Sequence, residues 1–275
     1  MTIKTLKSGC SSLDNALLGG VPFKYVAGIH GLPNIGKSIL NLQYAFSFLQ
    51  KEKDRKAVIL ETEGMPFLEE TVNFLEKRFG LEGSIRNKRL IVEKVRGLAS
   101  LIRHFGYNFS CDFSEDGKIE KVKIKEGKEK RKLEEVWTQV GFLSVDSITA
   151  PIKQLLLTET KNLPGRSEVE NFLMGQMQIL AEDHDMVVIV TNHTSINPIR
   201  PFDIGTLSGG TALRYNLKFL FQIMPPDKSL RDIYGDEARR ILVNRLPFKK
   251  LTGEKIAVLL KEDYGFCDLK EIVNH

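Results

Sequence analysis

The sequence predicts an α/β fold with a mostly parallel central sheet flanked by helices and with antiparallel strands at one edge. Short apolar, β-branched runs alternate with amphipathic helical stretches between residues 25 and 190, a rhythm typical of βαβ units. The runs are apolar on both faces, as strands covered by helices on both sides of a parallel sheet must be. After about residue 210, three strand-like runs follow one another with little helix between them.

Five apolar runs are expected to form the parallel strands, and they cover 25–30, 57–60, 90–92, 141–145 and 186–190. Apolar residues at helical spacing predict helices between them, at 38–49, 67–79 and 167–185. Gly80 marks the end of the second helix. The antiparallel strands at the edge are expected at 217–224, 240–243 and 255–260.

The segment 107–136 interrupts this alternation. Polar and apolar residues alternate around Asp116-Gly117, which is a strong signal for a two-residue hairpin turn. A highly charged stretch, 125–132, follows. We interpret 107–136 as a charged hairpin and helix inserted into a single domain that spans 1–275, because no Pro/Ser-rich linker divides the chain. A solvated surface is favoured for the insertion over a contact with DNA or a protein partner.

Composition sets limits on the class of protein. The net charge of +5 is compatible with nucleic acid binding but too weak to predict it alone. Cys10, Cys111 and Cys267 are widely separated, and the five histidines show no metal-ligand spacing. No apolar run reaches the roughly 18 residues that a membrane span needs, and the N-terminus has no apolar signal-peptide core. We therefore expect a cytoplasmic protein without membrane contact.

The strongest chemical signal is the pattern G-x-x-x-x-G-K-[ST], which lies between an expected strand and an expected helix. It consists of Gly31, Leu32, Pro33, Asn34, Ile35, Gly36, Lys37 and Ser38, and Ile39 follows it. Backbone N–H groups of such a loop surround phosphates, and the helix N-terminus adds its positive dipole end. The lysine reaches the β- and γ-phosphates and the serine hydroxyl ligates Mg²⁺. The loop predicts ATP or GTP with Mg²⁺.

Polar residues at three other strand ends supply candidates for the remaining chemistry. Asp146 ends the run 141–145 and is a candidate for holding the metal. Glu61 and Glu63 follow the run 57–60 and are both candidates for orienting the attacking water, since alternate residues of an extended segment face one side. His193 ends the run 186–190 and is a candidate sensor of the γ-phosphate.

Several segments carry a resemblance to a known family through their order and spacing. These segments are 7–20, the glycine loop, E-T-E-G at 61–64, V-D-S-I-T at 145–149, P-G-R at 164–166, V-I-V-T-N-H at 188–193 and S-G-G at 208–210. Together they resemble the RecA/RadA recombinases, most closely the archaeal RadA paralogues. The resemblance covers most of the chain apart from the insertion.

The resemblance implies a RecA-like ATPase core that uses ATP and Mg²⁺ and acts in recombinational DNA repair. Glu63 is then the water-activating glutamate and Asp146 the metal-binding carboxylate. Single-stranded DNA would be bound by two loops, 151–166 and 194–208. Their candidate contact residues are Lys153 and Arg166 in the first loop and Arg200 and Phe202 in the second. The implied protein partner is a RadA-type recombinase or another paralogue, and the sequence leaves homo-oligomer formation open.

Departures from the family pattern narrow the expected function. The sequence begins at the ATPase core, so we expect an accessory protein rather than a recombinase. His193 and Glu61 stand where the family usually has Gln and Asp, which favours weak turnover. Two alternatives remain: a nucleotide-gated protein-interaction module with little turnover, and a KaiC-like regulatory ATPase.

Overall fold

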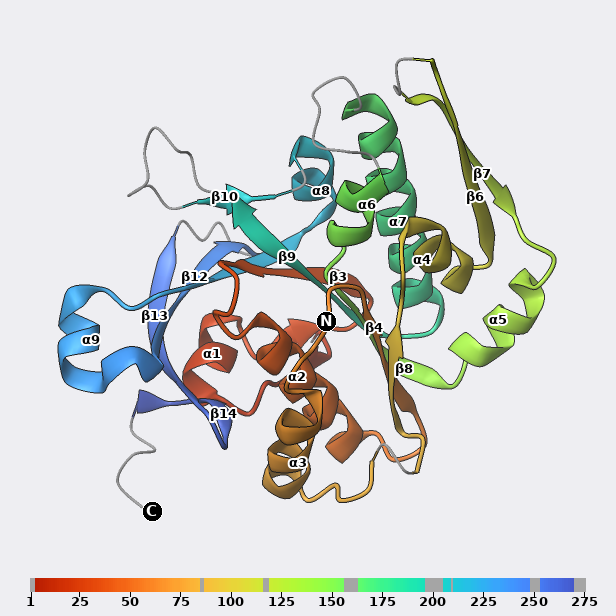
Figure 1. The fold of residues 1–275 in the computed structure, drawn as a ribbon. Helices are drawn as coiled ribbons and strands as arrows, with labels where there is room; N and C mark the ends of the chain where they lie inside the picture. Colours follow the sequence, from red (N-terminus) through yellow and green to blue (C-terminus); the bar gives the residue numbers. More distant parts are fainter. Residues whose placement is uncertain are drawn as a thin grey trace.

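The computed structural model describes residues 3–84, 87–115, 119–155, 163–195, 205–208, 210–247 and 253–269. Its centre is a ten-stranded sheet with the order β14-β13-β12-β11-β3-β9-β8-β4-β5, and β10 pairs with β9 (Figure 1). In chain order these strands are β3 (Tyr25–Gly31), β4 (Lys56–Glu61), β5 (Leu90–Lys94), β8 (Val140–Asp146), β9 (Val187–Ser195), β10 (Thr206–Leu207), β11 (Phe219–Met224), β12 (Ala238–Arg245), β13 (Glu254–Lys261) and β14 (Gly265–Cys267). The predicted α/β fold is confirmed.

The direction of one strand differs from the prediction. The five strands β3, β9, β8, β4 and β5 are parallel, as expected, and β12, β13 and β14 are antiparallel. However, β11 runs parallel to β3 and antiparallel only to β12, so it belongs to the parallel part of the sheet. The reason is helix α8 (Gly210–Asn216), which precedes β11 and lets the chain cross over before it enters the sheet.

Helices cover both faces of the sheet, as Figure 1 shows. One face packs against α1 (Ser11–Ala16), α2 (Lys37–Lys51) and α3 (Leu68–Phe79), and the other against α4 (Leu98–His104), α6 (Ala150–Leu155), α7 (Leu163–Asp183) and α8. Alternate residues of β9 supply the two cores: Ile189 faces the α2 side, whereas Val188 and Val190 face the α7 side. This two-sided burial explains why the strands are apolar throughout.

The predicted insertion forms a hairpin and a helix. Strands β6 (Tyr107–Phe113) and β7 (Ile119–Glu126) pair antiparallel, and α5 (Lys130–Trp137) follows. The Tyr107 ring packs edge-on against Phe172 of α7, with 4.9 Å between ring centroids, so one face of the hairpin extends the core. The turn predicted at Asp116-Gly117 lies outside the described residues.

The smaller elements complete the fold. They are β1 (Thr5–Leu6), β2 (Val21–Pro22), α9 (Lys228–Tyr234) and a 3₁₀ turn (Gly235–Glu237). Among the helices of the described ranges, none is long and apolar enough to cross a bilayer.

Candidate nucleotide site at the strand ends

The glycine loop connects β3 to α2 in a shape that its two glycines make possible. Gly36 precedes α2 with φ of 105°, a conformation that side chains rarely adopt. A Cβ on Gly31 would lie 2.7 Å from the carbonyl oxygen of Ile223 on the neighbouring strand. Because α2 begins at Lys37, its N-terminal N–H groups face the loop. This arrangement suits an anion.

Lys37 is folded over the loop and is 7% exposed. Its Nζ donates to the carbonyl oxygen of Leu32 at 2.7 Å and to that of Gly31 at 3.3 Å. Burial lowers the pKa of this ammonium, and the nearby carboxylates of Asp146 and Glu63 oppose that shift. The carboxylates therefore favour a charged lysine at the mouth of the loop.

Asp146 and Ser38, the two candidate metal ligands, lie together. Thr191 donates a hydrogen bond to Asp146 Oδ1 and the Ser38 hydroxyl also bonds the carboxylate. Asp146 Oδ2 is buried and has no hydrogen-bond partner among the residues that the structure describes. Burial raises the pKa of Asp146, and the Thr191 and Ser38 hydrogen bonds and Lys37 act against it. A buried carboxylate oxygen without a partner, next to a hydroxyl, fits the hard oxygen ligands that Mg²⁺ prefers.

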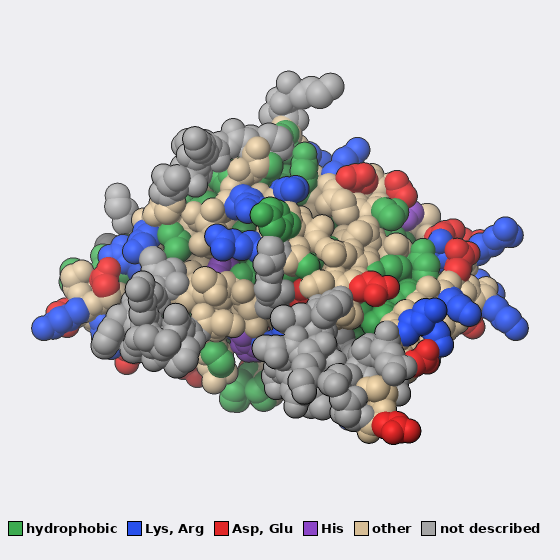
Figure 2. Space-filling view, turned by 90° about the horizontal axis from the view of Figure 1, so that it is seen from above, with side chains coloured by type: hydrophobic (Ala, Val, Ile, Leu, Met, Phe, Trp, Pro, Cys, Tyr) green, Lys and Arg blue, Asp and Glu red, His purple; other side chains and the backbone are tan. Residues whose placement is uncertain are grey.

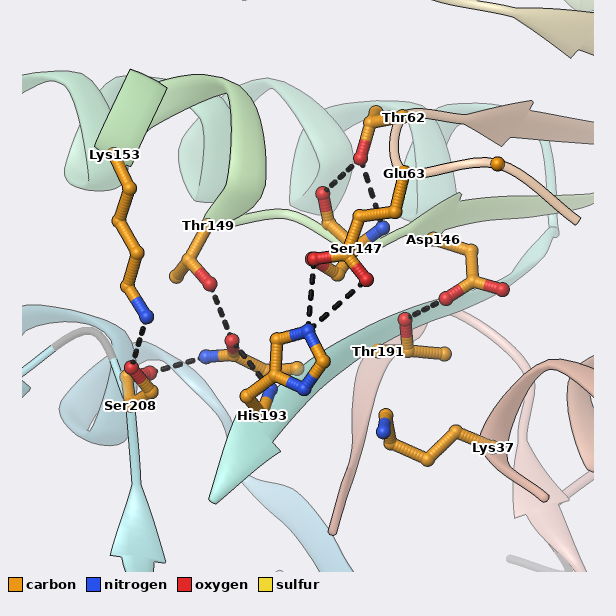
Figure 3. Close-up of polar contacts among 12 residues, drawn as sticks. Lys37, Thr62, Glu63, Asp146, Ser147, Thr149, Lys153, Thr191, His193 and Ser208 are labelled. Carbon is orange, nitrogen blue, oxygen red and sulfur yellow. Dashed lines mark hydrogen bonds and ion pairs between the residues drawn. The ribbon is translucent and has the colours of Figure 1, made fainter. Parts of the chain in front are cut away.

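Glu63 faces the same site from the end of β4. Its Oε1 accepts from Ser147 Oγ at 2.8 Å, and its two oxygens lie 2.9 and 3.0 Å from His193 Nε2 (Figure 3). The carboxylate is partly open to solvent, with a side-chain exposure of 34%. The neighbouring Thr62 hydroxyl donates to the carbonyl oxygen of Ser147 and accepts from its N–H. These two bonds connect the end of β4 with the end of β8.

Glu61 has a different role from Glu63, although sequence spacing could not separate them. Glu61 is 4% exposed, and its Oε1 accepts from the backbone N–H of Gly64. The side chain therefore stabilises the turn that carries Glu63. The expectation that both carboxylates face the site is corrected: Glu63 contacts the site residues, and Glu61 supports the turn beneath them.

A cavity of about 480 Å³ opens beside these residues. Its walls include part of the predicted nucleotide-binding set, namely Pro33, Asn34, Gly36, Lys37, Ser38, Ile39, Glu63 and His193. It continues between α2 and α3 over an apolar surface formed by Leu42, Met65, Phe67, Leu68 and Leu260. Gly31, Leu32 and Ile35 form the base of the loop, where Ile35 is buried in the core. A polar end and an apolar end in one cavity suit a nucleotide.

A chain of hydrogen bonds leads from His193 away from the cavity. Ser208 N donates to the His193 carbonyl oxygen at 2.9 Å, and Lys153 Nζ donates to Ser208 Oγ at 2.7 Å (Figure 3). Lys153, proposed from the sequence as a DNA contact, thus lies close to the strand ends. Arg166 instead pairs with buried Glu170 at 3.0 Å. Arg200 and Phe202 lie outside the described residues.

Sequence reasoning did not assign the partners that fix these side chains. Ser147, Thr62 and Thr191 had no assigned role, yet they hold Glu63, the β4–β8 junction and Asp146. The available signal was that polar residues continue past the apolar part of each strand. That signal indicates which edge of the sheet carries the site. It does not indicate which side chains bond to each other, because the partners come from different strands.

Comparisons with known proteins agree with this arrangement. DNA repair protein RAD51 homolog 3 of Cricetulus griseus is 27% identical over 202 residues, which cover 66% of this chain and 50% of that protein. The matched part is thus about half the length of that relative. The crystal structure of the RadB recombinase matches the fold with a TM-score of 0.64 and 21% identity, covering 97% of this chain and 100% of that one. No protein-family model matches the chain.

The fold and the strand-end site define the class as an α/β protein with a RecA-like recombinase core and a glycine loop. The chain therefore shares the fold of the RadB recombinase and is similar in sequence to part of a RAD51 homolog.

Proposed function

We propose that this protein is a RadA paralogue that binds and hydrolyses ATP, binds single-stranded DNA and modulates strand exchange by a recombinase during DNA repair. The observation that supports it most is the convergence of four strand ends on one cavity. Lys37, Glu63, Asp146 and His193 come from segments far apart in the sequence and meet beside the glycine loop (Figure 3). Sequence similarity to a RAD51 homolog and the fold shared with the RadB recombinase support the same function.

Each side chain has a role in this proposal. Lys37 would bind the β- and γ-phosphates, and Ser38 and Asp146 would hold Mg²⁺, which would neutralise phosphate charge. Glu63 orients the attacking water, and His193 holds the Glu63 carboxylate in place and contacts the γ-phosphate. The proposal is tested by ATPase assays of the purified chain with and without single-stranded DNA.

DNA binding is proposed for the ends of the two loops. β10 pairs antiparallel with the last residues of β9, Thr206 opposite Ser195, so the segment between them begins and ends beside His193. The other segment, 151–166, differs from the predicted loop in that its described ends belong to α6 and α7, and Lys153 of α6 bonds Ser208 next to β10. DNA phosphates bound beside Lys153 and β10 would then lie close to the nucleotide site.

Affinity for single-stranded DNA is expected to weaken with salt, because phosphate contacts release counterions. Lys153→Gln should lower the slope of log K against log salt by about 0.7, the value for one phosphate contact on a single strand. Fluorescence anisotropy of a labelled oligonucleotide at several salt concentrations measures it. Lys51→Gln, at the exposed C-terminal end of α2, should leave the slope unchanged. Equal slopes for Lys153→Gln and the unmodified chain would remove Lys153 from the interface.

A second candidate function, a nucleotide-gated interaction module, is favoured by the contacts of Glu63. Both carboxylate oxygens lie within hydrogen-bonding distance of His193, and one also accepts from Ser147. A glutamate engaged in this way is less available to a water molecule. ATP would then order the segment after β9 and control a protein partner with little turnover.

His193→Gln distinguishes the two candidates. If His193 restrains Glu63, as in the interaction module, turnover in His193→Gln should rise by about threefold to tenfold, on the order of one hydrogen bond. If His193 instead positions Glu63 for the attacking water, turnover should fall by about the same factor. Phosphate release under saturating ATP measures this change. His184→Gln is the control, since His184 lies after α7, away from the cavity lining. Unchanged turnover in His193→Gln would show that His193 does not restrain Glu63.

The remaining parts of the proposal rest on the resemblance to the RecA/RadA proteins. The partner is proposed to be a RadA-type recombinase or another paralogue, and the location the cytoplasm of an archaeal cell. The chain is proposed to act as a single domain, with the hairpin and α5 as a surface insertion.

A further inference from the structure

A second cavity, of about 200 Å³, lies near the end of β3. Its walls come from β3, β10, α8, β11 and β12 and include His30, Thr206, Arg214, Leu220, Asn244 and Arg245. Leu220 belongs to the core on the α7 side of the sheet, whereas Ile29, next to His30, belongs to the core on the α2 side. The cavity therefore lies on the opposite face of β3 from α2 and is separate from the nucleotide cavity.

The described residues that line this cavity give it a positive charge. Arg214 and Arg245 both line it, and the described residues that line it include no aspartate or glutamate. The Arg214 side chain is exposed and has no hydrogen bond or ion pair with any other described residue. Basic side chains gather on this face above α8 and β10 (Figure 2). Two guanidinium groups with no acidic partner among the described residues favour binding of an anion.

Arg245 is held in position by the protein. Its Nη1 donates to the carbonyl oxygens of Arg214 at 2.9 Å and Leu217 at 3.1 Å. These bonds fix the guanidinium plane at the wall and use only one of its three nitrogens. The remaining donors are fixed in direction, so an anion that binds them costs little ordering of the side chain.

His30 forms the floor and is 2% exposed. Its Nδ1 lies 2.9 Å from Thr194 Oγ1 and its Nε2 3.1 Å from Asn244 Oδ1. Burial, together with the positive charges of Lys37 and Arg214, lowers the pKa of His30 to about 4, and the Asn244 hydrogen bond opposes the shift. The neutral ring donates from Nε2 to the Asn244 oxygen and accepts from Thr194. The Asn244 N–H₂ group makes no hydrogen bond with another described residue, so it can act as a further donor.

We propose that this cavity is a second phosphate site, independent of the glycine loop. Arg214, Arg245 and the Asn244 amide surround it with donors, which matches the several acceptor oxygens of a phosphate better than the two of a carboxylate. Two ligands could supply the phosphate group: inorganic phosphate, or a backbone phosphodiester of single-stranded DNA. The second source is reached through β10, which lines the cavity and belongs to the segment proposed to bind DNA.

The first arm of the test uses inorganic phosphate and a Lys37→Ala background, in which the glycine loop has lost its own phosphate-binding lysine. Sodium phosphate is titrated at constant ionic strength while NMR follows the His30 ring signals, with sodium chloride as the reference salt. The His30 signals are expected to saturate with phosphate and not with chloride. Adding Arg214→Gln should raise the dissociation constant about tenfold or more, as expected for a hydrogen bond to a charged group.

The matched control is Arg103→Gln, which removes the same charge from an exposed position on α4. It should leave the phosphate dissociation constant unchanged. If Arg214→Gln and Arg103→Gln give the same constant, or if chloride shifts the His30 signals as phosphate does, the proposal is overturned. Circular dichroism of each variant shows that the fold is kept, and Arg214 is exposed, so its replacement leaves the core intact.

The second arm uses a labelled single-stranded oligonucleotide and the chain with Lys37 intact. If the occupant is a DNA phosphodiester, Arg214→Gln should lower the salt slope by about 0.7, and inorganic phosphate should compete with the oligonucleotide. If only the first arm responds, the site takes a free phosphate; either pattern supports the site. Only this arm rests on the proposed function, because the first arm needs neither ATP nor DNA. The phosphate site and the proposed function can therefore fail separately.

Discussion

Replacing Lys37 by alanine is expected to lower ATP turnover by about 100-fold to 1,000-fold, the range for losing one preorganised donor at a reacting centre. Lys37 is buried beside Asp146 and Glu63, and in the proposal its ammonium carries the developing charge on the γ-phosphate. Affinity for ATP should also fall, by about tenfold or more, because the ammonium binds phosphate in the ground state. Phosphate release and titration with a fluorescent ATP analogue measure the two effects separately.

Lys51→Ala is the control for this variant, because Lys51 lies at the other end of the same helix and is exposed. Its turnover and its affinity for ATP should equal those of the unmodified chain. If Lys37→Ala retains full turnover while it remains folded, the glycine loop does not bind the reacting phosphates, and the ATPase proposal fails.

Glu63→Gln is expected to lower turnover by about 100-fold or more, the contribution of a general base, while ATP binding is kept. The reason is geometric: Glu63 projects from the end of β4 toward the cavity and is held by Ser147 and His193. The amide keeps the size of the side chain and can still hydrogen-bond, but it cannot accept a proton from water. Single-turnover measurements at saturating ATP separate this chemical step from binding.

Glu61→Gln provides a control two residues away with the same chemical change. Glu61 accepts from the Gly64 N–H, and a glutamine oxygen can accept the same bond, so turnover should stay within about threefold of the unmodified chain, a difference smaller than one hydrogen bond. A large loss in Glu61→Gln with little change in Glu63→Gln would reverse the roles of the two glutamates.

The secondary structure was largely predictable because hydrophobic periodicity records which faces are buried. The strand runs at 57–60 and 90–92 became β4 and β5 with only a few added residues, and Gly80 ends α3 in the left-handed conformation. The glycine loop was predictable because its backbone shape needs glycine at fixed spacing. The direction of β11 was not predictable, since strand polarity depends on the crossover through α8 rather than on the composition of the strand.

The pairing of side chains was only partly predictable. The sequence indicates that Asp146 and His193 lie at strand ends, but which residues meet depends on strand order: β9 lies between β3 and β8, and β8 next to β4. That order brings His193 to Glu63, 130 residues earlier in the chain. The contact of His30 with Asn244 spans 214 residues, so the second cavity has no signal in the sequence.

ATP hydrolysis by the unmodified chain, measured in the presence of Mg²⁺ with and without single-stranded DNA and alongside sedimentation of the same sample, tests the central claim most directly. The proposal predicts slow but measurable phosphate release that needs Mg²⁺ and increases when DNA is added. Tight ATP binding without phosphate release under either condition would contradict the claim that the strand-end site is catalytic and would favour a nucleotide-gated module.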